Sequence, residues 1–292
     1  MSEGVAHNVG PARIDIGYER CGDPAAPPVL LIMGGGAQMI NWPEGFCTEL
    51  VDRGLQVIRF DGRDTGRSTH FADAPVPDVR GALAGDLSCV SSTLSDMVAD
   101  SVGLLDVLRL DGAHMVGASL GGMVAQTVAI EYPDRVRSLT SMFSTTGDRA
   151  VGQADVAALG PIGAPPVDRR GYIDWQVRAM RAVGSPGFAF DEAGGGRPGR
   201  PLLRPPFGML RQAVAVVASG DRTDRLRELR VPTLVRHGTD DKMSDISGGR
   251  ATAAAIPGAK LVIFDGMGHH LPPELWAELA GYIAGLVQRA SR

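Results

Sequence analysis

The chain has 292 residues, of which 44% are hydrophobic and 21% are charged, and its formal net charge is −4. This length is sufficient for one large domain with a substantial core, and the lack of a basic excess argues against nucleic-acid binding. The three cysteines show no Cys-x-x-Cys spacing, which argues against a disulfide framework and a zinc site. We therefore expect a globular protein that uses no metal and no cofactor.

No feature of a membrane protein or of a secreted protein is visible in the sequence. Residues 1–7 contain no basic segment followed by an apolar one, which is the pattern of a secretory signal. No uncharged apolar stretch reaches about 18 residues, the length that a membrane-spanning helix needs. We expect a cytoplasmic protein without membrane insertion, and the sequence leaves its oligomeric state open.

Segments typical of strands and of helices alternate along most of the chain. In chain order, the strand segments are apolar runs or polar and apolar alternations, at residues 13–18, 29–33, 56–60, 114–118, 136–143, 233–238 and 260–266. Helical spacing of apolar residues is found at residues 42–53, 93–110, 120–131 and 273–289. This alternation predicts an α/β fold with a mostly parallel central sheet and helices on both faces. The alternating strand 13–18 is expected at an edge of the sheet.

One long region departs from this alternation. From residue 144 to about residue 230 there is no convincing strand, and a segment dense in glycine and proline separates two helical pieces, 172–182 and 209–218. Because a structureless loop of that length is uncommon inside a compact domain, we predict an inserted helical lid over residues 145–230. Residues 1–144 and 231–292 then form the core.

The motif Gly117-Ala118-Ser119-Leu120-Gly121 lies between a predicted strand and a predicted helix. A Gly-x-Ser-x-Gly sequence in that context is typical of a nucleophile elbow, a sharp turn that exposes a serine hydroxyl at the end of a strand. The two glycines fit the places where larger side chains would collide with the neighbouring strand and helix. Ser119 is therefore the candidate nucleophile.

A serine hydroxyl needs a base within hydrogen-bond reach and an acid that orients the base. Asp240 and Asp241 follow the strand at 233–238, and His269 follows the strand at 260–266. The acid therefore precedes the base along the chain, which is the order expected for a nucleophile elbow. The residues themselves do not distinguish Asp240 from Asp241.

Among the histidines, His269 is the predicted base. The glycines before His269 can form a tight loop that reaches back over the serine, which favours it over its neighbour His270. His114 lies at the wrong end of the serine's own strand, His70 follows an earlier strand, and His237 precedes the acid in sequence.

Two backbone amides are expected to stabilise the oxyanion that forms during acyl transfer. The amide of Leu120, directly after the nucleophile, is one donor. The loop Gly34-Gly35-Gly36, after the strand at 29–33, is the natural source of the second, because three glycines permit a close approach of the backbone to a substrate.

Nearly the whole chain resembles the α/β-hydrolase superfamily. Within it, the chain is similar to an esterase branch that includes aclacinomycin methylesterase and related actinobacterial lipases and esterases. The similarity is carried by four segments, Leu31-Ile32-Met33-Gly34-Gly35, Asn41-Trp42-Pro43, residues 57–68 and residues 117–126.

This resemblance implies that Ser119 is the nucleophile, Asp241 the acid and His269 the base, with the amides of Gly35 and Leu120 as the oxyanion hole. It also favours Asp241 over Asp240. Two positions depart from the common pattern of the superfamily without removing a catalytic group. Met33 stands where many members have His, although the methylesterase-like branch shares this Met, and Lys242 stands where Pro is common.

We therefore predict a serine hydrolase that cleaves a carboxylic ester of a small, apolar or polycyclic molecule through an acyl-enzyme, such as a methyl ester of a secondary metabolite. The same triad serves alternatives: a C–C bond hydrolase, a lactonase or thioesterase, and a cofactor-free perhydrolase. A non-hydrolytic ligand-binding or tailoring protein on the same fold is the alternative of another class. The lid carries no motif that identifies the substrate.

Overall fold

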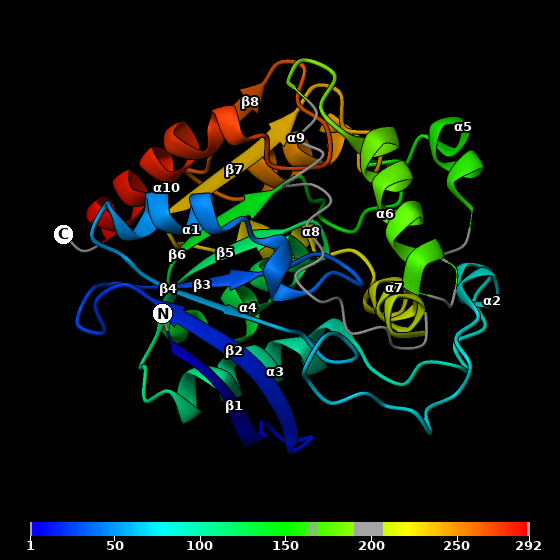
Figure 1. The fold of residues 1–292 in the computed structure, drawn as a ribbon, viewed down its shortest axis with the longest axis horizontal. Helices are drawn as coiled ribbons and strands as arrows, with labels where there is room; N and C mark the ends of the chain where they lie inside the picture. Colours follow the sequence, from blue (N-terminus) through cyan, green and yellow to red (C-terminus); the bar gives the residue numbers. More distant parts are fainter. Residues whose placement is uncertain (1, 164–165, 167–168, 190–206, 291–292) are drawn as a thin grey trace.

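The computed structural model describes residues 2–163, 166, 169–189 and 207–290. In this part of the chain, eight strands form one sheet in the order β1-β2-β4-β3-β5-β6-β7-β8 (Figure 1). Their bounds are Ser2–Val9 (β1), Ile14–Cys21 (β2), Pro28–Ile32 (β3), Gln56–Phe60 (β4), Ala113–Ala118 (β5), Val136–Met142 (β6), Thr233–Gly238 (β7) and Lys260–Phe264 (β8). Strands β3 to β8 are parallel, whereas β1 and β2 form an antiparallel edge.

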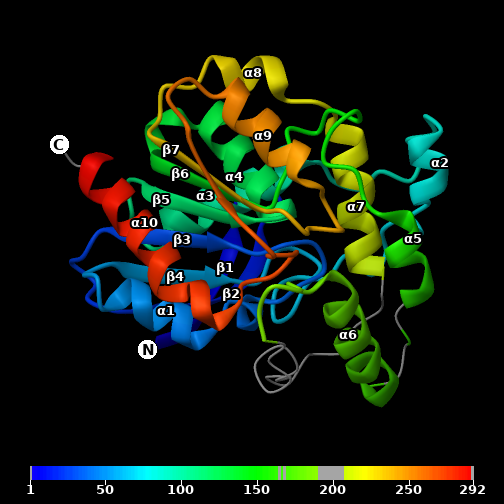
Figure 2. The same ribbon diagram turned by 90° about the horizontal axis from the view of Figure 1, so that it is seen from above.

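Helices cover both faces of this sheet (Figure 2). Helices α1 and α10 pack together on one face, and α3, α4, α8 and α9 cover the other. Their bounds are Glu44–Val51 (α1), Leu94–Val107 (α3), Leu120–Glu131 (α4), Thr223–Arg227 (α8), Ile246–Ala255 (α9) and Trp276–Ala290 (α10). Each face has its own apolar cluster, and β3, β4, β5 and β7 are buried along their whole length. Strand β3 is a continuous apolar run, as is typical of a strand covered on both faces, whereas β4, β5 and β7 also bury polar residues such as Arg59, His114 and Arg236.

The remaining helices lie beyond the end of the sheet at which the parallel strands terminate (Figure 1). They are α2, α5, α6 and α7, with the bounds Val79–Leu83, Val156–Leu159, Arg169–Val183 and Phe207–Ser219. Short 3-10 turns are found at Met39–Asn41, Pro133–Arg135, Gly160–Ile162 and Pro273–Leu275. Helices α6 and α7 include the two helical pieces predicted between residues 144 and 230. The described part of that region contains no strand, while its role as a lid stays a prediction.

The predicted edge strand is corrected by the structure. Strand β2 is internal, because β1 pairs with it on one side and β4 on the other. The sequence did not predict β1, since only Ala6 and Val9 of its eight side chains are buried, which leaves no alternating apolar pattern. Helix α9 was also missed, because Gly248 and Gly249 lower its intrinsic helix propensity.

Candidate active site

Ser119 occupies a strained turn between β5 and α4. Its backbone has φ 55° and ψ −120°, a conformation that L-residues rarely adopt and that costs about 1–3 kcal/mol. A Cβ atom on Gly117 would lie 2.0 Å from the carbonyl oxygen of Gly121, and one on Gly121 would lie 2.0 Å from that of Ile32. Both neighbours are backbone atoms, so the turn requires glycine at each position.

The turn is held by hydrogen bonds from the neighbouring strand. The amide of Ser119 donates to the carbonyl of Met142 at 2.9 Å, and Ser144 Oγ donates to the carbonyl of Ser119 at 2.8 Å. These bonds fix the backbone at the end of β5 against the end of β6. The Ser119 residue itself remains partly exposed at this edge of the sheet.

The structure brings Asp241 and His269 together. His269 Nδ1 lies 2.8 Å from Asp241 Oδ2 and 2.9 Å from Oδ1, so the Nδ1–H donates to the carboxylate. The side chain of Asp241 is fully buried and that of His269 is 10% exposed. Asp240 is exposed instead, and its carboxylate accepts a hydrogen bond from Thr239 Oγ1. His270 Nδ1 lies 2.8 Å from Ser185 Oγ and takes no part in the pair.

Four donors surround the carboxylate of Asp241. Besides His269, the amides of Met243 and Ser244 donate to Oδ1 at 2.9 and 3.0 Å, and His237 Nε2 lies 3.3 Å from Oδ2. Burial alone would raise the pKa of Asp241, but the hydrogen bonds from His237, His269 and Ser244 outweigh it and hold this pKa well below the usual range. Asp241 therefore stays ionised and keeps the proton of His269 on Nδ1.

His237 contacts Asp241 and was not among the site residues predicted from the sequence. Its side chain is fully buried, and Nε2 lies 2.7 Å from the carbonyl oxygen of Ser244 as well as 3.3 Å from Asp241. Both neighbours are acceptors, so Nε2 carries the proton, and the buried Nδ1 has no partner within the described residues. The sequence placed His237 before the predicted acid and excluded it as a base, and its position four residues before Asp241 was the available signal for this contact.

His269 is supported by aromatic packing and by the end of α6. The ring of Phe143 packs on His269 with 4.8 Å between centroids, and the amide of His269 donates to the carbonyl of Val183 at 2.8 Å. Phe143 directly follows Met142, whose carbonyl accepts from the amide of Ser119, so the end of β6 contacts both Ser119 and His269. No hydrogen bond joins Ser119 Oγ to His269 among the described residues. Such bonds often tighten only in the complex with substrate.

A buried arginine, Arg236, also lies near Phe143. The guanidinium of Arg236 is 5.9 Å from the ring centroid of Phe143 and 4.7 Å from that of Phe264. Burial lowers the pKa of Arg236 to about 9, so the group is still charged at neutral pH. Burial, followed by the charge of Arg236, also lowers the pKa of His270.

The glycine loop after β3 lies directly against the elbow. A Cβ on Gly34 would be 3.1 Å from Ser119 Cβ, and one on Gly35 would be 3.7 Å from Leu120 Cδ2. Leu120 is the first residue of α4, so its amide has no acceptor within the helix. The amides of Gly35 and Leu120 therefore belong to adjacent backbone segments beside the serine.

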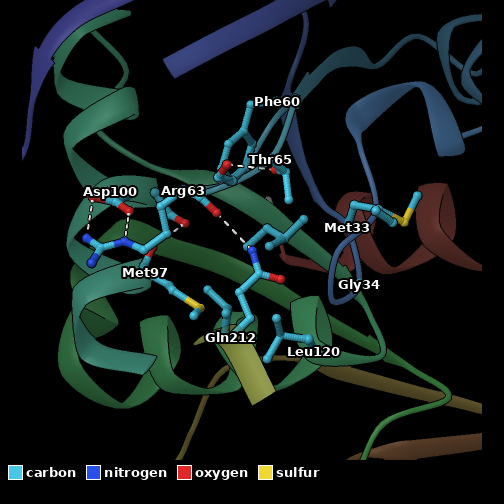
Figure 3. A pocket seen from close by; sticks show the side chains of 14 residues that line it. Met33, Gly34, Phe60, Arg63, Thr65, Met97, Asp100, Leu120 and Gln212 are labelled. Atoms are coloured by element: carbon cyan, nitrogen blue, oxygen red, sulfur yellow. Dashed lines mark hydrogen bonds and ion pairs between the residues drawn. The ribbon is translucent and has the colours of Figure 1, made fainter. Parts of the chain in front are cut away.

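A small cavity borders this loop (Figure 3). Its volume is about 40 Å³, and its wall includes Gly34, Arg63, Asp100, Leu120 and Gln212. A space of this size holds about one water molecule, so it is too small for a substrate.

The chain has the alpha/beta hydrolase fold. Residues 27–159 match the family defined by the alpha/beta hydrolase fold. The solved structure of the meta-cleavage product hydrolase from Pseudomonas fluorescens IP01 superposes with a TM-score of 0.73 at 19% identity, and the comparison covers 98% of each chain. The predicted fold class is thereby confirmed. No helix in the described part of the chain has the length and the apolar character to cross a membrane.

Among curated proteins, the chain is similar to two rhodomycin D methylesterases, from Streptomyces peucetius and Streptomyces sp. (strain C5). They are 28% and 27% identical to it, over 94% of this chain and 95% of each relative. A 2-hydroxy-6-oxo-6-phenylhexa-2,4-dienoate hydrolase from Comamonas testosteroni is 27% identical over 87% of this chain and 84% of that protein. The predicted resemblance to the methylesterase branch is confirmed, as is the prediction of a hydrolytic enzyme.

Proposed function

We propose that this chain hydrolyses a carboxylic ester through an acyl-enzyme, with Ser119 as nucleophile, His269 as base and Asp241 as the acid that orients it. The observation that carries the proposal is the pairing of Asp241 with His269 Nδ1 at 2.8 Å, next to a serine in a strained elbow. A histidine held in this tautomer presents Nε2 as a free acceptor for the serine proton.

The residues then act in a fixed order. Ser119 Oγ attacks the ester carbonyl carbon while His269 Nε2 takes its proton, and the carbonyl oxygen becomes an oxyanion near the amides of Gly35 and Leu120. The C–O bond of the ester breaks, and His269 gives the proton to the departing alcohol. Water attacks the acyl-enzyme in the same way, which releases the acid and restores Ser119. Asp241 stabilises the imidazolium in both halves.

For the substrate, we propose an ester of a small apolar or polycyclic molecule, such as a methyl ester of a secondary metabolite. This rests on the names of the two methylesterases, which cover nearly the whole chain. A panel of short-chain, long-chain and polycyclic methyl esters, compared by kcat/KM, tests the proposal. A preference for long-chain esters would contradict it.

The mechanism is tested by replacing the nucleophile. Ser119→Ala should abolish ester hydrolysis and covalent labelling by a fluorophosphonate, while the far-UV circular dichroism stays unchanged. Ser95→Ala is a matched control, since Ser95 is exposed on α3 and bonds Glu131. Labelling of the wild type at a residue other than Ser119 would overturn the assignment, and no labelling at all in folded protein would favour a non-hydrolytic binding protein.

Hydrolysis of a C–C bond is the second candidate function. It is favoured by the similarity to the 2-hydroxy-6-oxo-6-phenylhexa-2,4-dienoate hydrolase. Incubation with this dienoate and with a methyl ester, followed by product analysis, separates the two. Turnover of the dienoate at a higher kcat/KM than every ester would make C–C hydrolysis the main activity.

We also propose that residues 145–230 form a lid over the site, as predicted from the sequence. Three described helices of that region, α5, α6 and α7, support this role because they lie past the strand ends that carry Ser119 and Asp241 (Figure 1). The fourth, α8, packs against α9 over the sheet and belongs with the core. A cytoplasmic location stays a prediction.

A further inference from the structure

One face of α7 contacts two loops of the core. A Cβ on Gly208 would lie 2.4 Å from the carbonyl oxygen of Asp64, and one on Gly36 would lie 2.8 Å from Met209 Cβ. One turn further along α7, Gln212 also faces the two loops, with the spacing that puts residues on one side of a helix. Helix α7 is thus packed against both the glycine loop and the loop after β4.

Gln212 joins these two loops through its amide group. Its Oε1 accepts from the amide of Gly36 at 2.8 Å, and its Nε2 donates to the carbonyl of Arg63 at 2.9 Å. Figure 3 shows the side chain extending from α7 toward Arg63. The residue is 5% exposed, so both bonds are formed away from bulk water, where a lost partner is costly.

The hydrogen bond between the Gly36 amide and Gln212 matters because it restrains the backbone next to the Gly35 amide. The carbonyl of Gly34 accepts from the amide of Ala37 at 3.2 Å. Since a peptide unit is planar and trans, fixing this carbonyl also fixes the direction of the Gly35 N–H. The Gly36 amide, held by Gln212, anchors the peptide on the other side of Gly35. Three consecutive glycines have no side chains to restrain them, so the loop depends on such outside contacts.

The helix that carries Gln212 is itself anchored. Arg211 forms two hydrogen bonds with Asp64, both of 3.0 Å, and both side chains are buried. Arg63, whose carbonyl Gln212 binds, is held by Asp100 through bonds of 2.6 and 2.9 Å. The helix that carries Gln212 and the loop whose carbonyl Gln212 binds are therefore both held in place by these interactions.

We propose that Gln212 is a positioning residue for the oxyanion hole, which it orients through the Gly36 amide. The inference rests on the proposed function, because it assumes that the Gly35 amide binds the oxyanion. Gln212 acts through the loop and does not bind the substrate. A loop displaced by about 1 Å is enough to lower the rate of acyl transfer by about 100-fold.

The first test is Gln212→Met, which keeps the length of the side chain and removes both hydrogen bonds. We expect kcat on a methyl ester to fall by about 10- to 100-fold with KM changed less than about threefold, because the oxyanion interaction is made mainly in the transition state. Affinity for a trifluoromethyl ketone analogue of the tetrahedral intermediate should fall by the same factor. Ser219→Ala is the matched control, since it removes the bond of α7 to the Leu94 amide at the other end of the helix.

The second test is Gln212→Glu, which keeps the proposal testable if the methionine variant does not fold. A protonated glutamic acid reproduces both bonds, whereas a carboxylate faces the Arg63 carbonyl and adds negative charge near the oxyanion. At pH 8, where the carboxylate is the expected form, kcat should therefore fall by about 10-fold or more. A kcat within twofold of the wild type at pH 8 would count against the proposal.

A folded Gln212→Met protein with kcat within twofold of the wild type, or with an effect confined to KM, would overturn the inference. That outcome is distinguishable from failure of the proposed function. In the latter case the wild type itself would neither hydrolyse the esters nor be labelled at Ser119.

Discussion

The acid–base pair and the glycine loop are positioned in different ways. Asp241 is held by groups within four residues of it in sequence, His237, Met243 and Ser244, and by His269 from the loop after the next strand. Gly36 is held by Gln212, which is 176 residues away along the chain. One part of the site is thus built from local strand ends, whereas the other depends on a distant helix of the predicted lid.

Because they are held by different contacts, the pair of Asp241 and His269 and the glycine loop can be disrupted separately. Damage to the acid–base pair should change the chemistry and leave α7 in place. Damage to the attachment of α7 should lower stability and disturb the loop while the hydrogen bond between Asp241 and His269 remains.

The largest effect is expected for Asp241→Asn. The substitution keeps the shape of the side chain but removes the charge that holds the Nδ1–H tautomer, so kcat should fall about 10,000-fold. Asp240→Asn is the control, because Asp240 is exposed and bonds Thr239, and its kcat should stay within about twofold. Equal losses in the two variants would show that the pair is not the catalytic one.

Next in size is Arg211→Met, which tests the attachment of α7. It leaves the carboxylate of Asp64 buried without its partner, so the free energy of unfolding should fall by about 3–5 kcal/mol in urea titrations. The control is Arg227→Met, whose ion pair with Asp224 is exposed and should contribute less than about 1 kcal/mol. A loss as small in Arg211→Met as in the control would mean that α7 is not held by this pair.

A smaller loss of kcat is expected when His237 is replaced. His237→Leu removes one donor to Asp241 and leaves the Ser244 carbonyl unpaired, so kcat should fall about 10-fold. His237→Gln can place an amide N–H where Nε2–H lies and should recover most of the rate. If both variants lose the same amount, hydrogen bonding by His237 is not what positions the acid.

The smallest effect concerns acid stability. Because the pKa of Asp241 is lowered below its unfolded value of 3.8, its contribution to stability is present above that value and is lost as pH falls through it toward the folded pKa. Between about pH 5 and about pH 3 the wild type should lose about 1 kcal/mol that Asp241→Asn does not lose. Unfolding curves at both pH values measure the difference, and parallel losses would contradict the assigned direction of the shift.

Much of the fold could be predicted from the sequence because its signals are local. The buried parallel strands are apolar runs, and the elbow is a short motif between a strand and a helix. The same strand order predicted where the acid and the base would follow. Asp241 and Asp240 could not be separated, because only the turn after β7 decides which carboxylate points inward.

What could not be predicted depends on contacts between distant segments. Helix α9 contains Gly248 and Gly249, and glycines in a sequence argue against a helix. In the structure, however, a Cβ on Gly249 would lie 2.5 Å from His237 Nδ1. The glycine is needed because the helix packs closely on β7. The proposed role of Gln212 could not be predicted either, because nothing in the sequence around Gln212 indicates a partner 176 residues away.

The glycine loop also indicates where this protein tolerates redesign. A methyl group on Gly36 would collide with Met209 and would require a φ of +69°, and one on Gly34 would press on Ser119 at 3.1 Å. On Gly35 its nearest neighbours are at ordinary contact distances of 3.7 to 3.9 Å. In a mutant library, position 35 is therefore the one of these three glycines where a methyl group fits without a change in its surroundings.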